Sequence, residues 1–553
     1  MHNRFQSHTR NLLLPCVAFS MAAGFASAIL VTVFKLAAEI VIHLSNILYT
    51  GVRENPVWLP LLVLGAALVG FGASLILSLS HSCRGGGIPT SVTAIRGIIS
   101  LKWIASIFVL PFSALLTFFC GLPLGTEGPC VQMGTAVGDG VVSCFGAKKH
   151  KGWRRYIMTG GASAGFSIAT SAPISGILFS MEELHKHFSP LLLAVASLSV
   201  MTAEITAQAL AFLGIGSVGL FHLPDISAIP AIPAKMYFAP LLLGLICGGC
   251  SIFFTNFYVC VDKWMHGMLK KTSVKILFPI LFAAVAVVGF FMSDVLGTGH
   301  ALVDGILRTR TVWYLLILVF FLRAIVMMVS NTAGTTGGIF LPTLAFGAIL
   351  GALCAEGMIA LGWLEAEQYA LMVVLGIAAF LGAASRIPLT ACVFAVEALG
   401  GIHNVLPILI ATTVSFLVVE LYGLEDFTDT VIEANIRSIS KGKTPTVIEV
   451  PLTVKENSFV AGKERRDILW PNACVVISYE RAKENRGKPW VDVGDVITVH
   501  YKTRNPAAAA EELRALVGDQ SEEICRMMVP EIEDTAVGNG SIAQKSDRRR
   551  RSR

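Results

Sequence analysis

One acidic residue, Glu127, stands inside a glycine- and proline-rich break between apolar segments, in the sequence Gly125-Thr-Glu-Gly-Pro129. A carboxylate among membrane-type segments is costly and marks a candidate functional site. At the start of a helix it can occupy an anion site as a tethered anion, because unpaired N–H groups and the helix dipole favour negative charge there. Protonation would release the carboxyl group and free the site for a mobile anion, so one residue can act as both gate and proton carrier.

Two similar breaks occur at Gly85-Gly-Gly-Ile-Pro89 and Gly337-Gly-Ile-Phe-Leu-Pro342. In all three breaks proline falls in the first turn of the following helix, where its missing N–H costs nothing, and glycine lets the backbone approach a ligand closely. Non-helical backbone inside a bilayer is tolerated only where it is buried or lines a cavity. Ordinary packing glycines of membrane helices are the alternative, but three breaks, two of them related by a repeat, favour an anion site.

A pair of glutamates, Glu182 and Glu183, ends another apolar segment close to His185 and Lys186. A carboxylate at membrane depth is a functional candidate. A solvated helix end explains the pair equally well, and the sequence leaves both interpretations open.

The segments that must position these residues are those of a membrane protein. Of the 553 residues 54% are hydrophobic and 14% charged, with a mean hydropathy of +0.69, whereas soluble proteins carry about 25% charged residues. The net charge of +6 is mild, so membrane lipid rather than nucleic acid is the expected partner. Several windows reach the roughly 20 apolar residues of a spanning helix: Trp58–Ser80, Leu191–Gly214, Ala239–Val261, Leu277–Leu296 and Val312–Met328.

Two parts of this membrane region repeat each other. Gly125–Pro129 aligns with Gly338–Pro342 at an offset of 213, with Gly134 matching Gly347. Duplicated halves with interrupted segments are typical of transporters that bind their substrate near mid-membrane. A second alignment, at an offset of 215, has identical residues at Gly161/Gly376, Ala164/Ala379, Ala169/Ala384, Pro173/Pro388, Phe179/Phe394, Glu182/Glu397 and Leu184/Leu399.

The chain changes character near residue 440, since 37 of its 80 charged residues lie in positions 441–553. We therefore predict an all-α polytopic membrane domain over 1–440 and a small soluble α/β domain over 446–517. In the second domain, β-branched runs at 446–454, 474–479 and 496–501 predict strands, and 507–517 predicts a short helix. The tail, 518–553, is acidic and then ends in Arg-rich sequence, which predicts disorder.

Over about residues 11–435 the breaks at Gly85–Pro89, Gly125–Pro129 and Gly337–Pro342, together with Met181-Glu-Glu-Leu184, resemble the signatures of the CLC chloride channel/transporter family. The resemblance implies the CLC fold of two inverted repeats, in a homodimer with one pore per subunit. It implies that Glu127 is the external gating glutamate and Glu183 the internal proton-transfer glutamate, with Glu182 beside it at the cytoplasmic mouth. The residues that it places around the anion are Gly86, Gly87, Ile88, Gly128, Ile339, Phe340 and Thr428, with the amides of Ile339 and Phe340 at the centre.

Four positions depart from the family pattern. Gly86 replaces the family's serine, and Thr428 aligns loosely with its pore-lining tyrosine, so both hydroxyl-bearing anion contacts are changed. Thr126 and Leu110 replace two basic residues near the pathway, whereas Arg323 keeps the basic residue ahead of the third break. These changes predict weak central anion binding and loose coupling to protons.

The soluble part resembles the TrkA-C (RCK C-terminal) domain through Gly462-Lys463, Asp467, Pro471 and Gly494-Asp495. This resemblance implies a regulatory module that binds a small molecule or assists dimerisation. A small domain that only aids assembly is the alternative.

We therefore expect exchange of chloride for protons in a bacterial inner membrane, with the C-terminal domain in the cytoplasm. A passive CLC-type anion channel is the alternative; Glu127 and Glu183 favour the exchanger. A more distant alternative is a cation transport protein regulated by the RCK-like domain, but the chain lacks a carbonyl filter of the TVGYG type. The first break also differs from the GNNLI motif of the fluoride-exporting branch. We expect neither an enzyme nor a cofactor, because no His/Cys/carboxylate cluster has catalytic spacing.

Overall fold

The computed structural model describes residues 2–518 apart from 86, 100, 146–152, 217–232, 234–235, 401, 424–426, 433–445 and shorter gaps after 455. Within the chain, Met1–Lys441 form one compact helical unit and most residues from Gly442 onward form a second, smaller one. The predicted tail over 518–553 lies outside the described residues except for Gly518, as does most of the predicted helix over 507–517.

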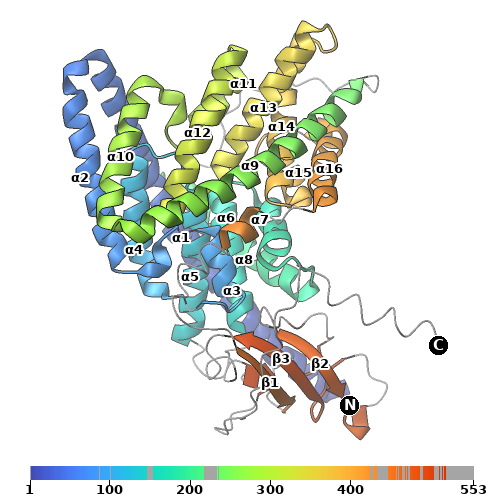
Figure 1. The fold of residues 1–553 in the computed structure, drawn as a ribbon. Coiled ribbons are helices and arrows are strands. Elements are labelled where there is room, and N and C mark those ends of the chain that lie inside the picture. Colours follow the sequence, from blue (N-terminus) through green and yellow to red (C-terminus); the bar gives the residue numbers. More distant parts are fainter. Residues whose placement is uncertain are drawn as a thin grey trace. The chain divides into compact units, whose positions relative to one another are not determined.

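Among the described residues of the first unit, nine helices are long and apolar enough to cross a membrane. Figure 1 shows α2 and α10 side by side at one edge of this unit, with α15 and α16 at the other. All five predicted spanning windows are helical over most of their length. The nine are α1 (His2–Glu54), α2 (Leu59–Ser78), α8 (Pro190–Phe212), α9 (Phe238–Lys271), α10 (Val274–Phe291), α12 (Trp313–Ala333), α13 (Phe340–Ala360), α14 (Tyr369–Ala384) and α16 (Val405–Tyr422).

The other helices of this unit are shorter or less apolar. In α6 every side chain after Arg154 is buried within the protein, and so is every side chain of α5 up to Gly140, so their low hydropathy is no obstacle at membrane depth. They comprise α3 (Ile88–Ile95), α4 (Trp103–Phe119), α5 (Glu127–Phe145), α6 (Arg154–Thr170), α7 (Pro173–Phe179), α11 (His300–Arg308), α15 (Pro388–Glu397) and the π-helix η4 (Ser180–His185), with short 3₁₀ turns η1 (Pro56–Trp58), η2 (His81–Cys83), η7 (Ser293–Val295), η8 (Ala366–Gln368) and η9 (Ile402–Asn404).

The sequence repeat corresponds to two equivalent helix crossings. Helix α5 crosses α6 at Gly134, where an added β-carbon would lie 2.1 Å from the Gly161 carbonyl oxygen. Helix α13 crosses α14 at Gly347, where an added β-carbon would lie 2.6 Å from the Gly376 carbonyl oxygen. These glycines are the pairs that the two alignments match, and only glycine permits such close helix contact.

The two halves also cap each other's helices. The Glu182 carboxylate accepts from the amides of Leu389 (3.1 Å) and Thr390 (2.7 Å) at the start of α15. Its repeat mate Glu397 accepts from two first-turn amides of α7, both at 2.8 Å. A carboxylate satisfies orphan amides and the helix dipole there, so each half completes a helix of the other.

Buried Arg323 explains why the predicted span over Leu277–Leu296 is too long. Its guanidinium donates to four successive carbonyl groups, from Asp294 to Gly297, at 2.7 to 3.2 Å. Helix α10 ends at Phe291 instead, and the following irregular segment has its carbonyls satisfied by this one side chain, as buried backbone requires.

The second unit contains a three-stranded antiparallel sheet of order β1-β3-β2, from β1 (Thr446–Thr453), β2 (Cys474–Glu480) and β3 (Val496–Thr503), with the 3₁₀ turn η11 (Lys483–Asn485). The three predicted strands are therefore confirmed.

Although burial raises the pKa of Asp495, hydrogen bonds from Tyr479, Asn485 and two backbone amides outweigh it and hold that pKa below its usual value. The ionised Asp495 carboxylate thus fixes the turn that leads into β3.

Candidate functional site

The three glycine-rich breaks meet at one point, around Gly128. An added β-carbon at Gly128 would lie 2.6 Å from the Gly338 α-carbon and 3.2 Å from the Gly87 α-carbon. The starts of α3, α5 and α13 therefore converge with their backbones in direct contact. Converging helix N-termini concentrate unpaired amides and partial positive charge, which is the arrangement that binds an anion.

Gly125 and Gly338 join the two halves by an antiparallel bridge. The Gly125 amide donates to the Gly338 carbonyl and the Gly338 amide to the Gly125 carbonyl, both at 2.7 Å. These residues are equivalent in the repeat. Two equivalent residues that exchange the same bond must lie next to the axis that relates the halves, so the site is built on that axis.

Glu127 is the first residue of α5 and is completely buried. An added β-carbon at Gly125 would lie 2.3 Å from its Oε2 atom, so the carboxyl group covers the bridge between the halves. Among the described residues no side chain hydrogen-bonds to either carboxyl oxygen, and the groups that interact with the carboxyl group are the backbone amides of Glu127 itself and of Leu341, in the first turn of α13. A buried carboxyl group held only by main-chain amides has no side-chain partner that must rearrange when it changes its protonation state.

The predicted anion-binding residues fall into three groups. Gly128 lies at the convergence, and Ile339 and Phe340 begin α13, with the Phe340 ring packed edge-on against Phe166 and Phe394 at 5.1 and 5.6 Å. Gly87 and Ile88 begin α3, but the Gly87 amide donates to the Gln132 side chain at 2.8 Å. Thr428 is buried in a helical turn over 427–432, and Gly86 lies outside the described residues.

The neighbouring residues Glu182 and Glu183 have different surroundings in the structure. Glu183 is 2% exposed within the π-helical turn at the end of α7, a geometry that is often found at functional sites. Glu182 is turned to α15 as its cap. The interpretation as a solvated helix end is therefore wrong for Glu183, and the geometry gives Glu182 a structural contact that the sequence analysis missed.

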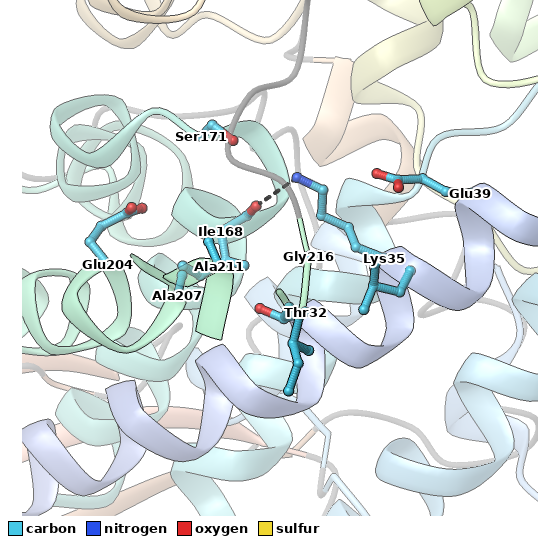
Figure 2. A pocket seen from close by; sticks show the side chains of 11 residues that line it. Thr32, Lys35, Glu39, Ile168, Ser171, Glu204, Ala207, Ala211 and Gly216 are labelled. Atoms are coloured by element: carbon cyan, nitrogen blue, oxygen red, sulfur yellow. Dashed lines mark hydrogen bonds between the residues drawn. The ribbon is translucent and has the colours of Figure 1, made fainter. Parts of the chain in front are cut away.

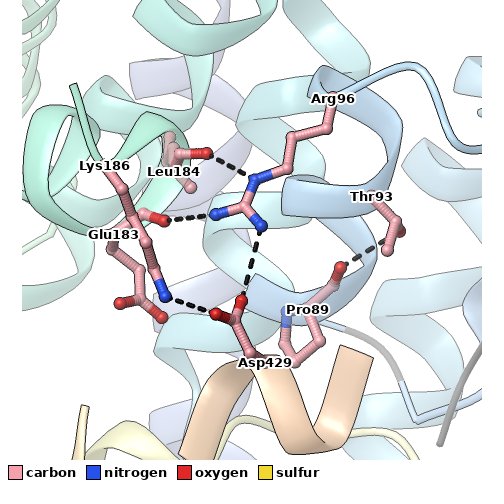
Figure 3. Close-up of polar contacts among 7 residues, drawn as sticks. All are labelled: Pro89, Thr93, Arg96, Glu183, Leu184, Lys186 and Asp429. Atoms are coloured by element: carbon pink, nitrogen blue, oxygen red, sulfur yellow. Dashed lines mark hydrogen bonds and ion pairs between the residues drawn. The ribbon is translucent and has the colours of Figure 1, made fainter. Parts of the chain in front are cut away.

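A charged cluster surrounds the turn that carries Glu183 (Figure 3). Arg96, which follows α3, donates to the carbonyls of Glu183 (3.3 Å) and Leu184 (3.1 Å) and pairs with Asp429 at 3.4 Å. Lys186 binds the second Asp429 oxygen. The cluster joins the end of α3, the Glu183 turn and the segment that holds Thr428. Sequence reasoning missed it because Arg96 and Asp429 are 333 residues apart.

We expect Asp429→Asn to loosen this segment without unfolding the protein. Both ion pairs are partly exposed, with side-chain exposures between 17% and 38%, and such pairs contribute about 0.2–1 kcal/mol each. A thiol probe should modify a cysteine placed at Thr428 about two to ten times faster in the Asp429→Asn background. Glu356→Gln, which breaks the remote Arg310 pair, is the control, and equal rates in all backgrounds would contradict the role of Asp429.

Comparison with known proteins identifies the family. A family model described as voltage gated chloride channel matches residues 65–420. The chain belongs to this family. It is 27% identical over 373 residues to the H(+)/Cl(-) exchange transporter ClcA of Vibrio parahaemolyticus, covering 66% of this chain and 78% of that protein. It is 26% identical over 411 residues to ClcA of Klebsiella pneumoniae, covering 73% and 84%.

Solved structures share the fold. The structure of a slow cyanobacterial Cl-/H+ antiporter matches with a TM-score of 0.69 at 22% identity, over 77% of this chain and 98% of that one. A CLC-type fluoride/proton antiporter matches with a TM-score of 0.61 at 20% identity, over 74% and 96%. The membrane unit of this voltage gated chloride channel family member therefore has the CLC fold.

Proposed function

We propose that this protein exchanges chloride for protons across a membrane, with Glu127 as the gate. The observation that carries the proposal is a fully buried carboxyl group with no side-chain partner at the start of α5, where three helix N-termini converge. The relatives named as H(+)/Cl(-) exchange transporters support the choice of ions. A carboxyl group is the simplest side chain that can compete with an anion when ionised and carry a proton when neutral.

The mechanism follows from mutual exclusion at one site. Ionised Glu127 occupies the positive end of the helices as a tethered anion. When it takes up a proton it loses that attraction, moves aside, and leaves the amides of Ile339 and Phe340 to chloride. Glu183 would supply protons from the other side of the membrane. Glu182 would take part only after its capping bonds to α15 are broken.

A passive CLC-type channel remains the competing function, because Thr428 offers only a short hydroxyl side chain where the family has a tyrosine. Purified protein in liposomes distinguishes the two. With opposed chloride and proton gradients, an exchanger gives a reversal potential that moves with the proton gradient, whereas a channel gives the chloride equilibrium potential at every pH.

We expect Thr428→Tyr and Gly86→Ser each to tighten chloride binding. A hydrogen bond to a charged group contributes roughly 1.5–3 kcal/mol, but water recovers part of it in the present site. A gain of about three- to thirtyfold in affinity should therefore appear in isothermal titration, together with sharper discrimination of chloride from bromide and nitrate. Tight chloride binding by the unmodified protein, unchanged by either substitution, would show that these side chains do not contact the anion.

The cellular membrane, the oligomeric state and the role of the C-terminal unit are also proposals. The apolar side chains exposed on the spanning helices suit membrane lipid, and we place the protein in a bacterial inner membrane as a homodimer. The sheet-containing unit would lie in the cytoplasm as a TrkA-C-like module that binds a small regulator. Its Asp495 turn, within the Gly494-Asp495 sequence that carries that resemblance, supports the choice of module.

A further inference from the structure

A cavity lies between α1, the end of α6 and α8, with Lys35 at its centre (Figure 2). The Lys35 ammonium donates to the Ile168 carbonyl at 3.2 Å, near the end of α6, where a positive charge is favourable. Figure 2 shows Glu39 and Glu204 on opposite sides of this ammonium group. The cavity volume of about 30 Å³ has room for about two water molecules.

This part of α1 lies close to the gate. Helix α1 packs against α5, and Phe34 and Ala38, which flank Lys35 on α1, contribute to the buried apolar cluster that also contains Cys130, one turn after Glu127. Helix α6 touches α5 there as well, since an added β-carbon at Gly165 would lie 2.4 Å from the Cys130 carbonyl oxygen. Ile168, the partner of Lys35, is one turn further along α6.

The other helices packed against α5 bring no charge to its first turn. Helices α3 and α4 contain no charged residue. In α6 the charged residues are Arg154 and Arg155, and Arg154 pairs with Asp139 toward the far end of α5. In α13 the one charged residue is Glu356, sixteen positions after Phe340.

Helix α1 also packs against α5, and its Lys35 binds the Ile168 carbonyl on α6, so this packing brings the Lys35 ammonium toward the first turn of α5. Arg84 lies in the loop before α3, against Gly334. The remaining charged groups that face the cavity are acidic: Glu39 is exposed, and Glu204 accepts from Ser167 and is influenced by Glu397.

We propose that Lys35 is a positioning residue for the gate: from its cavity, its positive charge favours the ionised form of the Glu127 carboxylate on the anion site. The proposal rests on the function proposed for Glu127. Neither Thr126 nor Leu110 is basic, so α1 supplies the side-chain charge that adds to the positive ends of the helices in keeping the gate closed. Glu39, four residues after Lys35, weakens this field.

The sign of the effect follows from this arrangement. A nearby cation favours the ionised carboxylate, so removing it lets Glu127 take up a proton at higher pH. For Lys35→Gln we expect the pH of half-maximal chloride flux to rise by about 0.5–1 unit, with equal pH on both sides of the liposome. Glu39→Gln removes an opposing charge and should move the same midpoint downward by a smaller amount.

Three further variants separate the effect of charge from that of structure. Lys35→Arg keeps the charge and the bond to Ile168, so its midpoint should match that of the unmodified protein. Lys275→Gln removes an exposed lysine at the start of α10 and should also leave the midpoint unchanged. Leu110→Lys, added to Lys35→Gln, should restore the midpoint, because Leu110 shares the buried cluster with Cys130.

A midpoint unmoved by Lys35→Gln, or moved equally by Lys35→Arg, would overturn the proposal. If Lys35→Gln does not fold, Glu39→Gln replaces it as the test, because Glu39 is exposed and its substitution should not disturb folding. A Glu39→Gln variant with no downward shift in the pH of half-maximal chloride flux would also overturn the proposal. A different result would show that the function proposed for Glu127 is wrong. In that case Glu127→Gln would leave the pH profile of chloride flux unchanged, whether or not Lys35 is substituted.

Discussion

Glu127→Gln abolishes proton movement while chloride flux persists: this is the result we expect in liposomes. The neutral amide has nearly the shape of the protonated carboxyl group but cannot take up or release a proton. It also lacks the negative charge that draws the carboxylate onto the helix N-termini. The measurement is proton uptake driven by a chloride gradient, and it should fall at least a hundredfold, to the level of empty liposomes.

Chloride flux in this variant should lose its dependence on pH. Glu367→Gln, an exposed carboxylate in the turn before α14, is the matched control and should keep both fluxes. If Glu127→Gln still drove protons against their gradient, Glu127 would not be the proton carrier. If it stopped chloride as well, the protonated side chain would not be an open gate.

The second large effect is expected from Gly128→Ala. The new methyl group would lie 2.6 Å from the Gly338 α-carbon and 3.0 Å from its amide nitrogen. Both are backbone atoms and cannot turn aside as a side chain can, so the starts of α5 and α13 must separate. Overpacking usually costs about 1–3 kcal/mol, and here the strain falls on the proposed anion site.

We expect Gly128→Ala to reduce chloride flux at least tenfold and to lower the unfolding temperature. Gly267→Ala on α9 is the matched control, because an added β-carbon there meets nothing within 4 Å. Normal flux and normal stability in Gly128→Ala would mean that the three helix starts are not held in contact in the working protein.

Much of this site could be predicted from the chain alone, because local rules govern it. Glycine followed by proline within a few residues is a local signal for the start of a helix, so the breaks around Glu127 and Phe340 were visible as motifs. The fixed offset between Gly125 and Gly338 predicted a repeat. What the motifs could not give was the partner of each break, since the bridge between these two glycines depends on how the halves dock.

Contacts between distant residues account for what the sequence analysis missed. Glu182 was placed in the proton pathway because it is next to Glu183 in the sequence. Its carboxylate instead caps a helix that begins more than two hundred residues later. Arg323 ends α10 by binding carbonyls of the segment that follows it, which hydropathy does not detect. Lys35 belongs to no sequence motif, and only the packing of α1 against α5 and α6 brings it toward Glu127.

The bridge between Gly125 and Gly338 also limits how the transporter can move. Many transporters rock one rigid half against the other to expose a central site first to one side and then to the other. Here the halves are tied together at their common axis by two short hydrogen bonds, and each also completes a helix of the other. A rocking motion would break these bonds beside the proposed anion site. We therefore expect the helical scaffold around the bridge to stay fixed during transport, with the carboxyl side chain of Glu127 as the main moving group.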